Sequence, residues 1–164
     1  MSTAREIPVD DINTLRRILK ECRVLAVVGL SAQWHRPSYF AAKYMLEHGY
    51  RVIPVNPQYK QVLGQKCYAS LREIPEKVDL VDVFRKTADV LPIAHEAIAI
   101  GARVLWQQLG VKNEAAAAAA RAAGLDAVMD RCVKIEHARL FGGLNWVGVN
   151  TRVISAKRPR WLAY

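Results

Sequence analysis

Residues 24–38, VLAVVGLSAQWHRPS, have the composition of a phosphate-binding turn. An apolar run ends at Gly29, and Pro37 and Ser38 then begin a segment of helical character. The start of a helix presents backbone N–H groups without partners, and the helix dipole makes this end favourable for anions. Because glycine lets the backbone turn close to a ligand, the stretch predicts a phosphate site.

Three side chains in this stretch could contact the phosphate: Ser31 and Ser38 offer hydroxyl donors, and Arg36 offers a positive charge. A glycine is also favoured at any strand-to-helix turn of an α/β fold, so the turn alone leaves a structural interpretation open. The dinucleotide pattern GxGxxG is absent, since positions 31 and 34 are Ser31 and Trp34. Residues 48–56 contain no carboxylate for a ribose, and the pattern GxxxxGK[ST] does not occur, which disfavours NAD and P-loop nucleotides.

Three further segments could complete such a site, because each follows an apolar run. Residues 53–60, IPVNPQYK, form a rigid loop in which a tyrosine could stack on a base and a lysine could meet a second phosphate. The alternative is a rigid loop with an exposed Tyr and Lys. Residues 83–86, VFRK, and 106–113, WQQLGVKN, add cations and amides. The candidate residues of the three segments are Asn56, Pro57, Tyr59, Lys60, Phe84, Arg85, Gln108 and Gly110.

Short apolar runs that alternate with segments of helical period predict the elements that position these residues. We expect strands at 24–30, 51–55, 80–84, 103–106 and 127–129. We expect helices at 11–21, 38–48, 88–100 and 113–123, and a glycine that can end a helix follows the last three. This alternation predicts a three-layer, Rossmann-like α/β fold, with a parallel sheet of about five strands flanked by helices. The candidate segments then meet at one edge of the sheet and form a crevice.

The composition is that of an ordinary one-domain globular protein, with 164 residues, 52% of them hydrophobic and 24% charged. No apolar run reaches the ~18 residues of a membrane span, and the N-terminus lacks the apolar core of a signal peptide, so we expect a cytoplasmic protein. The net charge is +9, and five cations but no acid follow Glu136. We therefore divide the chain into a domain, residues 1–140, and a basic C-terminal extension, residues 141–164. The basic balance favours an anionic partner.

Residues suited to catalysis are few. Cys22, Cys67 and Cys132 are widely spaced without a CxxC pair, so we expect free thiols and no zinc site. Cys132 falls at the same edge of the sheet and is the most suggestive nucleophile. No base can be assigned to it, which favours a half-buried structural thiol. We expect His35 to be a solvated loop residue and Glu136 a solvated helix residue.

The four segments, in this order, resemble the stand-alone CoA-binding domain proteins, the YccU-like group. They are also similar, more distantly, to the N-terminal domain of the succinyl-CoA synthetase α subunit. The resemblance extends over about residues 12–140. It is carried by VVGLS, RPS, GYRVIPVNP, LGQKCY, SLREIP, VDLVDVFR, WQQLG and AGLDAVMDRCVKIEH.

The resemblance implies that the ligand is coenzyme A or an acyl-CoA. It implies that the phosphates lie at Gly29, Leu30 and Ser31 and at the start of the helix at Ser38, with the pantetheine and adenine parts near the other candidate residues. The phosphorylated histidine of the synthetase belongs to a second domain that we expect to be absent here, so ligase activity is not implied. We expect binding without catalysis. The alternatives are an enzyme that acts on an acyl-CoA and a nucleic-acid-associated module that uses the basic extension; the sequence identifies no protein partner.

Overall fold

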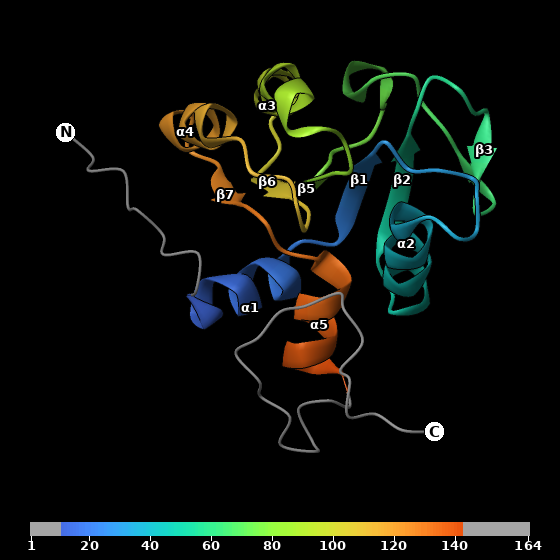
Figure 1. The fold of residues 1–164 in the computed structure, drawn as a ribbon, viewed down its shortest axis with the longest axis horizontal. Coiled ribbons are helices and arrows are strands. Elements are labelled where there is room, and N and C mark those ends of the chain that lie inside the picture. Colours follow the sequence, from blue (N-terminus) through green and yellow to red (C-terminus); the bar gives the residue numbers. More distant parts are fainter. Residues whose placement is uncertain (1–10, 143–164) are drawn as a thin grey trace.

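Five short runs rich in Val, Leu and Ala form one parallel sheet, because strands covered on both faces need apolar side chains at nearly every position. The strands are β1 (Val24–Val28), β2 (Arg51–Val55), β5 (Leu80–Val83), β6 (Val104–Gln107) and β7 (Asp126–Val128). Their order in the sheet is β2-β1-β5-β6-β7, and every pair is parallel. The computed structural model, which describes residues 11–142, thus confirms the five-stranded parallel sheet (Figure 1).

Helices cover both faces of the sheet and make the fold three-layered (Figure 1). They are α1 (Ile12–Glu21), α2 (Pro37–Glu47), α3 (Val90–Ala99), α4 (Glu114–Ala122) and α5 (Val133–Phe141). Buried residues of α1, α2 and α5 share one apolar core with one face of the sheet, and those of α3 and α4 share a second core with the other face. The sequence predicts α1 to α4; for α5 it gives no bounds and predicts only that Glu136 lies in a helix.

Three of the predicted helix ends depend on a glycine. Gly49, Gly101 and Gly124 follow α2, α3 and α4, and their φ angles are 86°, 72° and 89°. Such angles are accessible to glycine at little cost, and each residue lets the chain turn from a helix into the next strand. The glycines therefore confirm the predicted boundaries.

A small hairpin that the sequence analysis did not predict follows β2. It consists of β3 (Gln61–Val62) and β4 (Gln65–Lys66), paired antiparallel. The two turn residues, Leu63 and Gly64, have φ angles of 53° and 71°. Tight hairpin turns of this kind usually contain Asn-Gly or Asp-Gly. Here the first turn residue is a leucine, so the usual sequence pattern is absent. Two short 3-10 helices, η1 (Leu71–Glu73) and η2 (Thr87–Asp89), complete the elements of residues 11–142.

No helix within residues 11–142 is both long and apolar enough to cross a membrane. Nearly all of the predicted C-terminal extension, from residue 143 on, lies outside the described residues, and so does the basic segment on which the nucleic-acid alternative depends.

β2, β1 and β5 are neighbours in the sheet (Figure 1), and backbone contacts around Gly29 join their carboxyl ends. Gly29 follows β1 with a φ of 85°, and its N–H donates to the Val55 carbonyl at the end of β2 over 2.8 Å. On the other side, the Phe84 N–H donates to the Val28 carbonyl over 2.9 Å. A Cβ atom at position 29 would overlap the Phe84 carbonyl oxygen. The spacing of the strand ends therefore requires glycine here.

Replacing Gly29 with alanine is expected to destabilise the fold much more than the same change at Gly49. At both positions alanine must adopt a left-handed backbone, which costs about 1 kcal/mol in the free energy of unfolding. Nothing lies within 4 Å of a Cβ at Gly49, whereas at Gly29 the clash with Phe84 raises the loss to at least about 3 kcal/mol. Equilibrium urea unfolding of the two variants measures the difference, and equal losses would contradict the close approach at Gly29.

Candidate functional site

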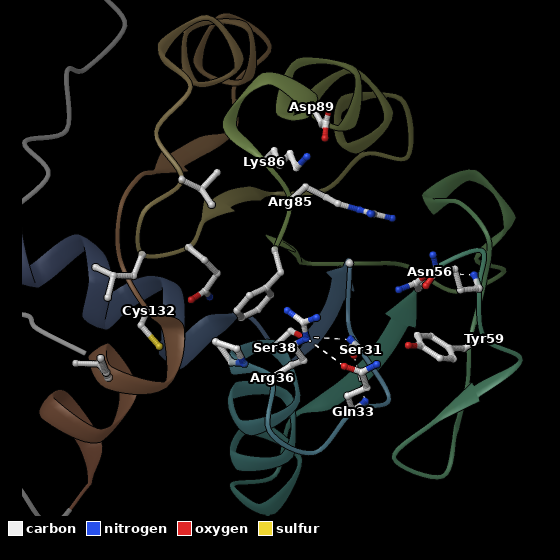
Figure 2. A pocket seen from close by; sticks show the side chains of 18 residues that line it. Ser31, Gln33, Arg36, Ser38, Asn56, Tyr59, Arg85, Lys86, Asp89 and Cys132 are labelled. Carbon is white, nitrogen blue, oxygen red and sulfur yellow. Dashed lines mark hydrogen bonds between the residues drawn. The ribbon is translucent and has the colours of Figure 1, made fainter. Parts of the chain in front are cut away.

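A cavity of about 860 Å³ opens at the carboxyl edge of the sheet, where the order of the strands changes direction between β1 and β5. Residues from all four predicted segments line it, and α5 contributes a further wall (Figure 2). In this view Cys132 and Tyr59 lie at opposite sides, with Ser31 and Ser38 between them. The predicted site residues that line the cavity are Gly29, Ser31, Arg36, Ser38, Asn56, Tyr59, Phe84, Arg85 and Gln108.

Four predicted residues are not among those that line the cavity. Leu30 is fully buried in the core under the turn, and Pro57 and Lys60 are exposed on the loop after β2. Gly110 has a φ of 83°, and its N–H donates to the Asp130 carboxylate over 2.7 Å. That contact ties the loop after β6 to the loop after β7.

The turn before α2 is held by its own polar groups. The Ser31 N–H donates to the Ser38 hydroxyl over 3.1 Å, and the Gln33 N–H donates to the Ser31 hydroxyl over 3.1 Å. Arg36, the residue before α2, makes no capping hydrogen bond with its side chain, and Pro37 follows as the first helical residue. The positive end of the α2 dipole therefore faces the cavity without a side-chain cap, which is an environment suited to an anion.

Asn56 links the loop after β1 to the loop after β2. Its side chain is 6% exposed; Nδ2 donates to the Leu30 carbonyl over 3.1 Å, and Oδ1 accepts from the Gln58 N–H over 3.0 Å. The Asn56 N–H donates to the Tyr68 carbonyl over 2.9 Å. Both ends of the amide are thus engaged within the protein, so Asn56 shapes the wall of the cavity and keeps β1 and β2 in register.

The outer part of the cavity is rich in positive charge. Arg36, Arg85 and Lys86 line it and are exposed, with Asp89 as the acidic residue among the lining side chains. Figure 2 shows Arg85 and Lys86 on one side of the opening and Arg36 on the other. Cations on opposite sides of a cleft raise the local concentration of anions.

Another part of the cavity wall is backed by a buried acid. Asp82, on β5, is 1% exposed and accepts a hydrogen bond from Gln108 Nε2 over 2.5 Å. Burial raises the pKa of Asp82 to about 7, and the hydrogen bond from Gln108 lowers it by less. Asp82 was not predicted as a site residue, although an acid within the otherwise apolar run LVDVF is unusual enough to have indicated it.

The Cys132 thiol lines the cavity and is half-buried. Burial raises its pKa, and a backbone hydrogen bond from Ile135 opposes that shift. The thiol is therefore protonated near neutral pH, which makes it a weak nucleophile. All three cysteines are free, as expected, and no group of three or more His, Cys, Asp or Glu side chains in the described part of the chain could hold a metal ion.

Glu136 is not the solvated residue that the sequence predicts. It is fully buried, and its carboxylate contacts Arg131 at 3.1 Å and Arg139 at 2.5 Å. The prediction is wrong because α5 packs against α1 and α2, which turns Glu136 inward. The same network holds the start of α5, since Trp106 Nε1 donates to the Arg131 carbonyl over 2.8 Å.

The sequence analysis did not assign several of the residues that line the cavity. His35, considered near the crevice, is exposed and does not line it. Most of the unassigned residues flank a predicted residue in the chain, whereas Ile135 belongs to α5, for which the sequence gives no bounds. Cys132 was predicted at this edge of the sheet but not as a binding residue. The other lining residues without a predicted role in binding are Gln33, Pro37, Gln58, Lys86, Asp89, Leu109, Val111 and Ile135.

Comparison with known proteins identifies relatives of the whole domain. Residues 23–138 match the model of a family described as CoA binding domain. The protein YneT of Bacillus subtilis is 39% identical over 124 residues, which cover 76% of this chain and 92% of YneT. A solved structure of a protein from Pyrococcus horikoshii is 41% identical with a TM-score of 0.80, and the match covers 84% of this chain and 99% of that one.

A partial relative is much longer than this chain. Acetate–CoA ligase (ADP-forming) I of Archaeoglobus fulgidus is 40% identical over 58 residues. The match covers 35% of this chain but only 8% of the ligase. The similarity therefore concerns one segment of that enzyme.

The burial of Asp82 is expected to make the protein less stable as the pH rises. Its pKa is about 7 in the folded protein and 3.8 as the ordinary value, so the folded state binds the proton more tightly than the unfolded state. The contribution of Asp82 to the free energy of unfolding is thus greatest below about pH 4 and falls by up to about 4 kcal/mol as the pH rises through about 7.

Urea unfolding of the wild type and Asp82→Asn between about pH 4 and pH 8 measures this contribution, since the asparagine does not titrate. The wild type is expected to lose stability relative to the variant over this range. A difference between the two proteins that stays constant with pH would show that Asp82 titrates as an ordinary exposed acid.

Proposed function

Because the chain belongs to the CoA-binding domain family, we propose that it binds coenzyme A or an acyl-CoA in the cavity at the carboxyl edge of the sheet. The observation that carries the proposal is the convergence, in one cavity, of the uncapped start of α2 with three cations, Arg36, Arg85 and Lys86. CoA has a diphosphate and a further phosphate on its ribose, so a site for it must hold several negative charges. A volume of about 860 Å³ is in the range of cofactor sites.

In this proposal the diphosphate lies at the turn formed by Gly29, Leu30 and Ser31 and at the first turn of α2. The positive end of α2 and Arg36 stabilise its charge there. The Gly29 and Ser31 N–H groups are engaged by Val55 and Ser38, so the phosphate would contact the remaining N–H groups of the turn and of the first turn of α2.

The base and the arm of CoA then extend to opposite sides of the turn. Tyr59 offers an aromatic ring for the adenine, next to the rigid Asn56–Pro57 exit and the exposed Lys60. The pantetheine arm extends toward Phe84–Arg85 and the Gln108–Gly110 loop. NAD is disfavoured because the residues after β2, where a carboxylate would hold the ribose, are Asn56, Pro57 and Gln58.

We propose that binding occurs without a reaction of its own. The support is the state of Cys132, the cysteine that lines the cavity, whose pKa is raised by burial. The match to the acetate–CoA ligase covers too little of that enzyme for its activity to be carried over. An enzyme that acts on an acyl-CoA remains the second candidate, and it rests on the fact that the Cys132 thiol lines the same cavity as the phosphate turn.

Isothermal titration with CoA, dephospho-CoA, NAD and ATP at matched salt tests the proposal. We expect CoA to bind best, and Arg85→Gln to weaken it about tenfold, because a hydrogen bond to a charged group is lost. Arg72→Gln is the matched control, since Arg72 is equally exposed but does not line the cavity. Hydrolysis of acetyl-CoA, followed in the wild type and Cys132→Ser, tests the second candidate.

Failure of CoA to bind to folded protein that carries no copurified nucleotide would overturn the proposal. Equal losses in Arg85→Gln and Arg72→Gln would place the ligand outside the cavity. Turnover of acetyl-CoA that disappears in Cys132→Ser would favour the enzyme over a protein that only binds.

A further inference from the structure

Asp82 is a buried acid in an otherwise apolar strand. It lies on β5 between Val27 of β1 and Trp106 of β6, two residues of the apolar core. Burying a carboxyl group is costly unless it gains partners, and most buried acids hold the backbone. Asp79, a half-buried acid just before β5, holds the backbone in this way, since its carboxylate accepts from the N–H groups of Arg23 and Val24. Within residues 11–142, the hydrogen bond of the Asp82 side chain is the one from Gln108.

Gln108 connects this acid to the cavity. Its side chain is 3% exposed and lines the cavity wall, and its Nε2 donates to Asp82 Oδ1 over 2.5 Å. An amide has one acceptor and one donor end, so a donor end occupied by Asp82 leaves Oε1 available. Among residues 11–142, the hydrogen bond of the Gln108 side chain is the one to Asp82, and no donor reaches Oε1. The wall thus contains a nearly buried acceptor without a partner in the described part of the chain.

We propose that Asp82 is a positioning residue, which holds Gln108 so that Oε1 accepts a hydrogen bond from an amide N–H of the ligand's arm. This inference rests on the proposed function, because the pantetheine arm of CoA carries two amide N–H groups and its nucleotide part carries none. A thiol is a weak donor, so the amide is the better partner. The pair would therefore select ligands with an amide-containing arm over plain nucleotides.

The charge of Asp82 determines which end of the Gln108 amide faces the cavity. An ionised carboxylate can only accept, so it holds Nε2 inward and leaves Oε1 for the ligand. A protonated Asp82 can donate to Oε1 instead, which turns Nε2 toward the cavity. Nε2 is a donor and cannot accept the amide N–H of the ligand. Burial raises the pKa of Asp82 to about 7, so both forms are populated near neutral pH.

Within residues 11–142, burial and the Gln108 hydrogen bond determine the shift in the pKa of Asp82. The sheet neighbours of Asp82 are apolar, and the titratable group that interacts with it is the thiol of Cys132, the residue before α5, whose own pKa is raised by burial. A ligand N–H that donates to Oε1 polarises the amide and strengthens its hydrogen bond to the carboxylate. Binding of the arm is therefore expected to release a proton from Asp82.

The test compares two ligands as a function of pH. CoA contains the arm, and adenosine 3′,5′-bisphosphate contains the nucleotide without it. We expect the ratio of their affinities in the wild type to rise about tenfold in favour of CoA between about pH 6 and pH 8, as Asp82 ionises. Asp82→Asn should lack this tenfold rise, so that only the change caused by the ligands' own phosphates, whose second pKa is about 6, remains. Gln108→Leu should weaken CoA about tenfold at about pH 8 and leave the bisphosphate within about twofold.

Desulfo-CoA, which keeps both amides and lacks the thiol, should behave as CoA does; if it behaves as the bisphosphate, the assignment to an amide is wrong. A ratio that varies with pH in Asp82→Asn as in the wild type would overturn the role of Asp82. So would equal losses of both ligands in Gln108→Leu, with thermal unfolding showing that the variants are folded. A wild type that binds neither ligand would instead overturn the proposed function on which the inference rests.

Discussion

The contact between the Gly29 backbone and the Phe84 carbonyl is the constraint on which the cavity depends. It brings the ends of β1 and β5 together at the point where the order of the strands changes direction, while the Gly29 N–H holds the end of β2. Because the ends of these three strands are joined, the chain after Gly29 must pass over the sheet before α2 begins. The positive end of α2, Asn56 and the cations after β5 then face the same space.

The cavity has two chemically different parts. Around the opening, exposed cations and a helix start offer charge, which attracts any phosphorylated ligand and discriminates little between them. In the wall, the Asp82–Gln108 pair offers a hydrogen-bond acceptor with a defined direction, nearly removed from water. Directional contacts in a dry environment discriminate more strongly than surface charge, because a ligand without the matching donor leaves a buried group unpaired. We therefore expect the contacts to the phosphates to supply most of the affinity, and the contact of the arm with Gln108 to supply the selectivity.

The local pattern predicts the sheet and most of the candidate site because both depend on features of short segments. Apolar runs mark the strands, glycines end α2, α3 and α4, and parallel strands bring the four exits to one edge. The roles of Glu136 and Asp82 depend on packing between distant segments. Glu136 is buried because α5 packs against α1 and α2, which lie far from it in the sequence, and Asp82 accepts its hydrogen bond from an amide 26 residues away. Asn56 lines the cavity as expected, but both ends of its amide are engaged by the protein, which no spacing in the sequence reveals.

A crystal structure of the protein grown with CoA would show where both ends of the ligand bind. We expect the diphosphate within about 3 Å of the backbone N–H groups between Gly29 and Ser38, with an amide N–H of the arm donating to Gln108 Oε1. CoA bound on another surface, or bound with its adenine at Gln108 and its arm in solvent, would rule out the proposed site.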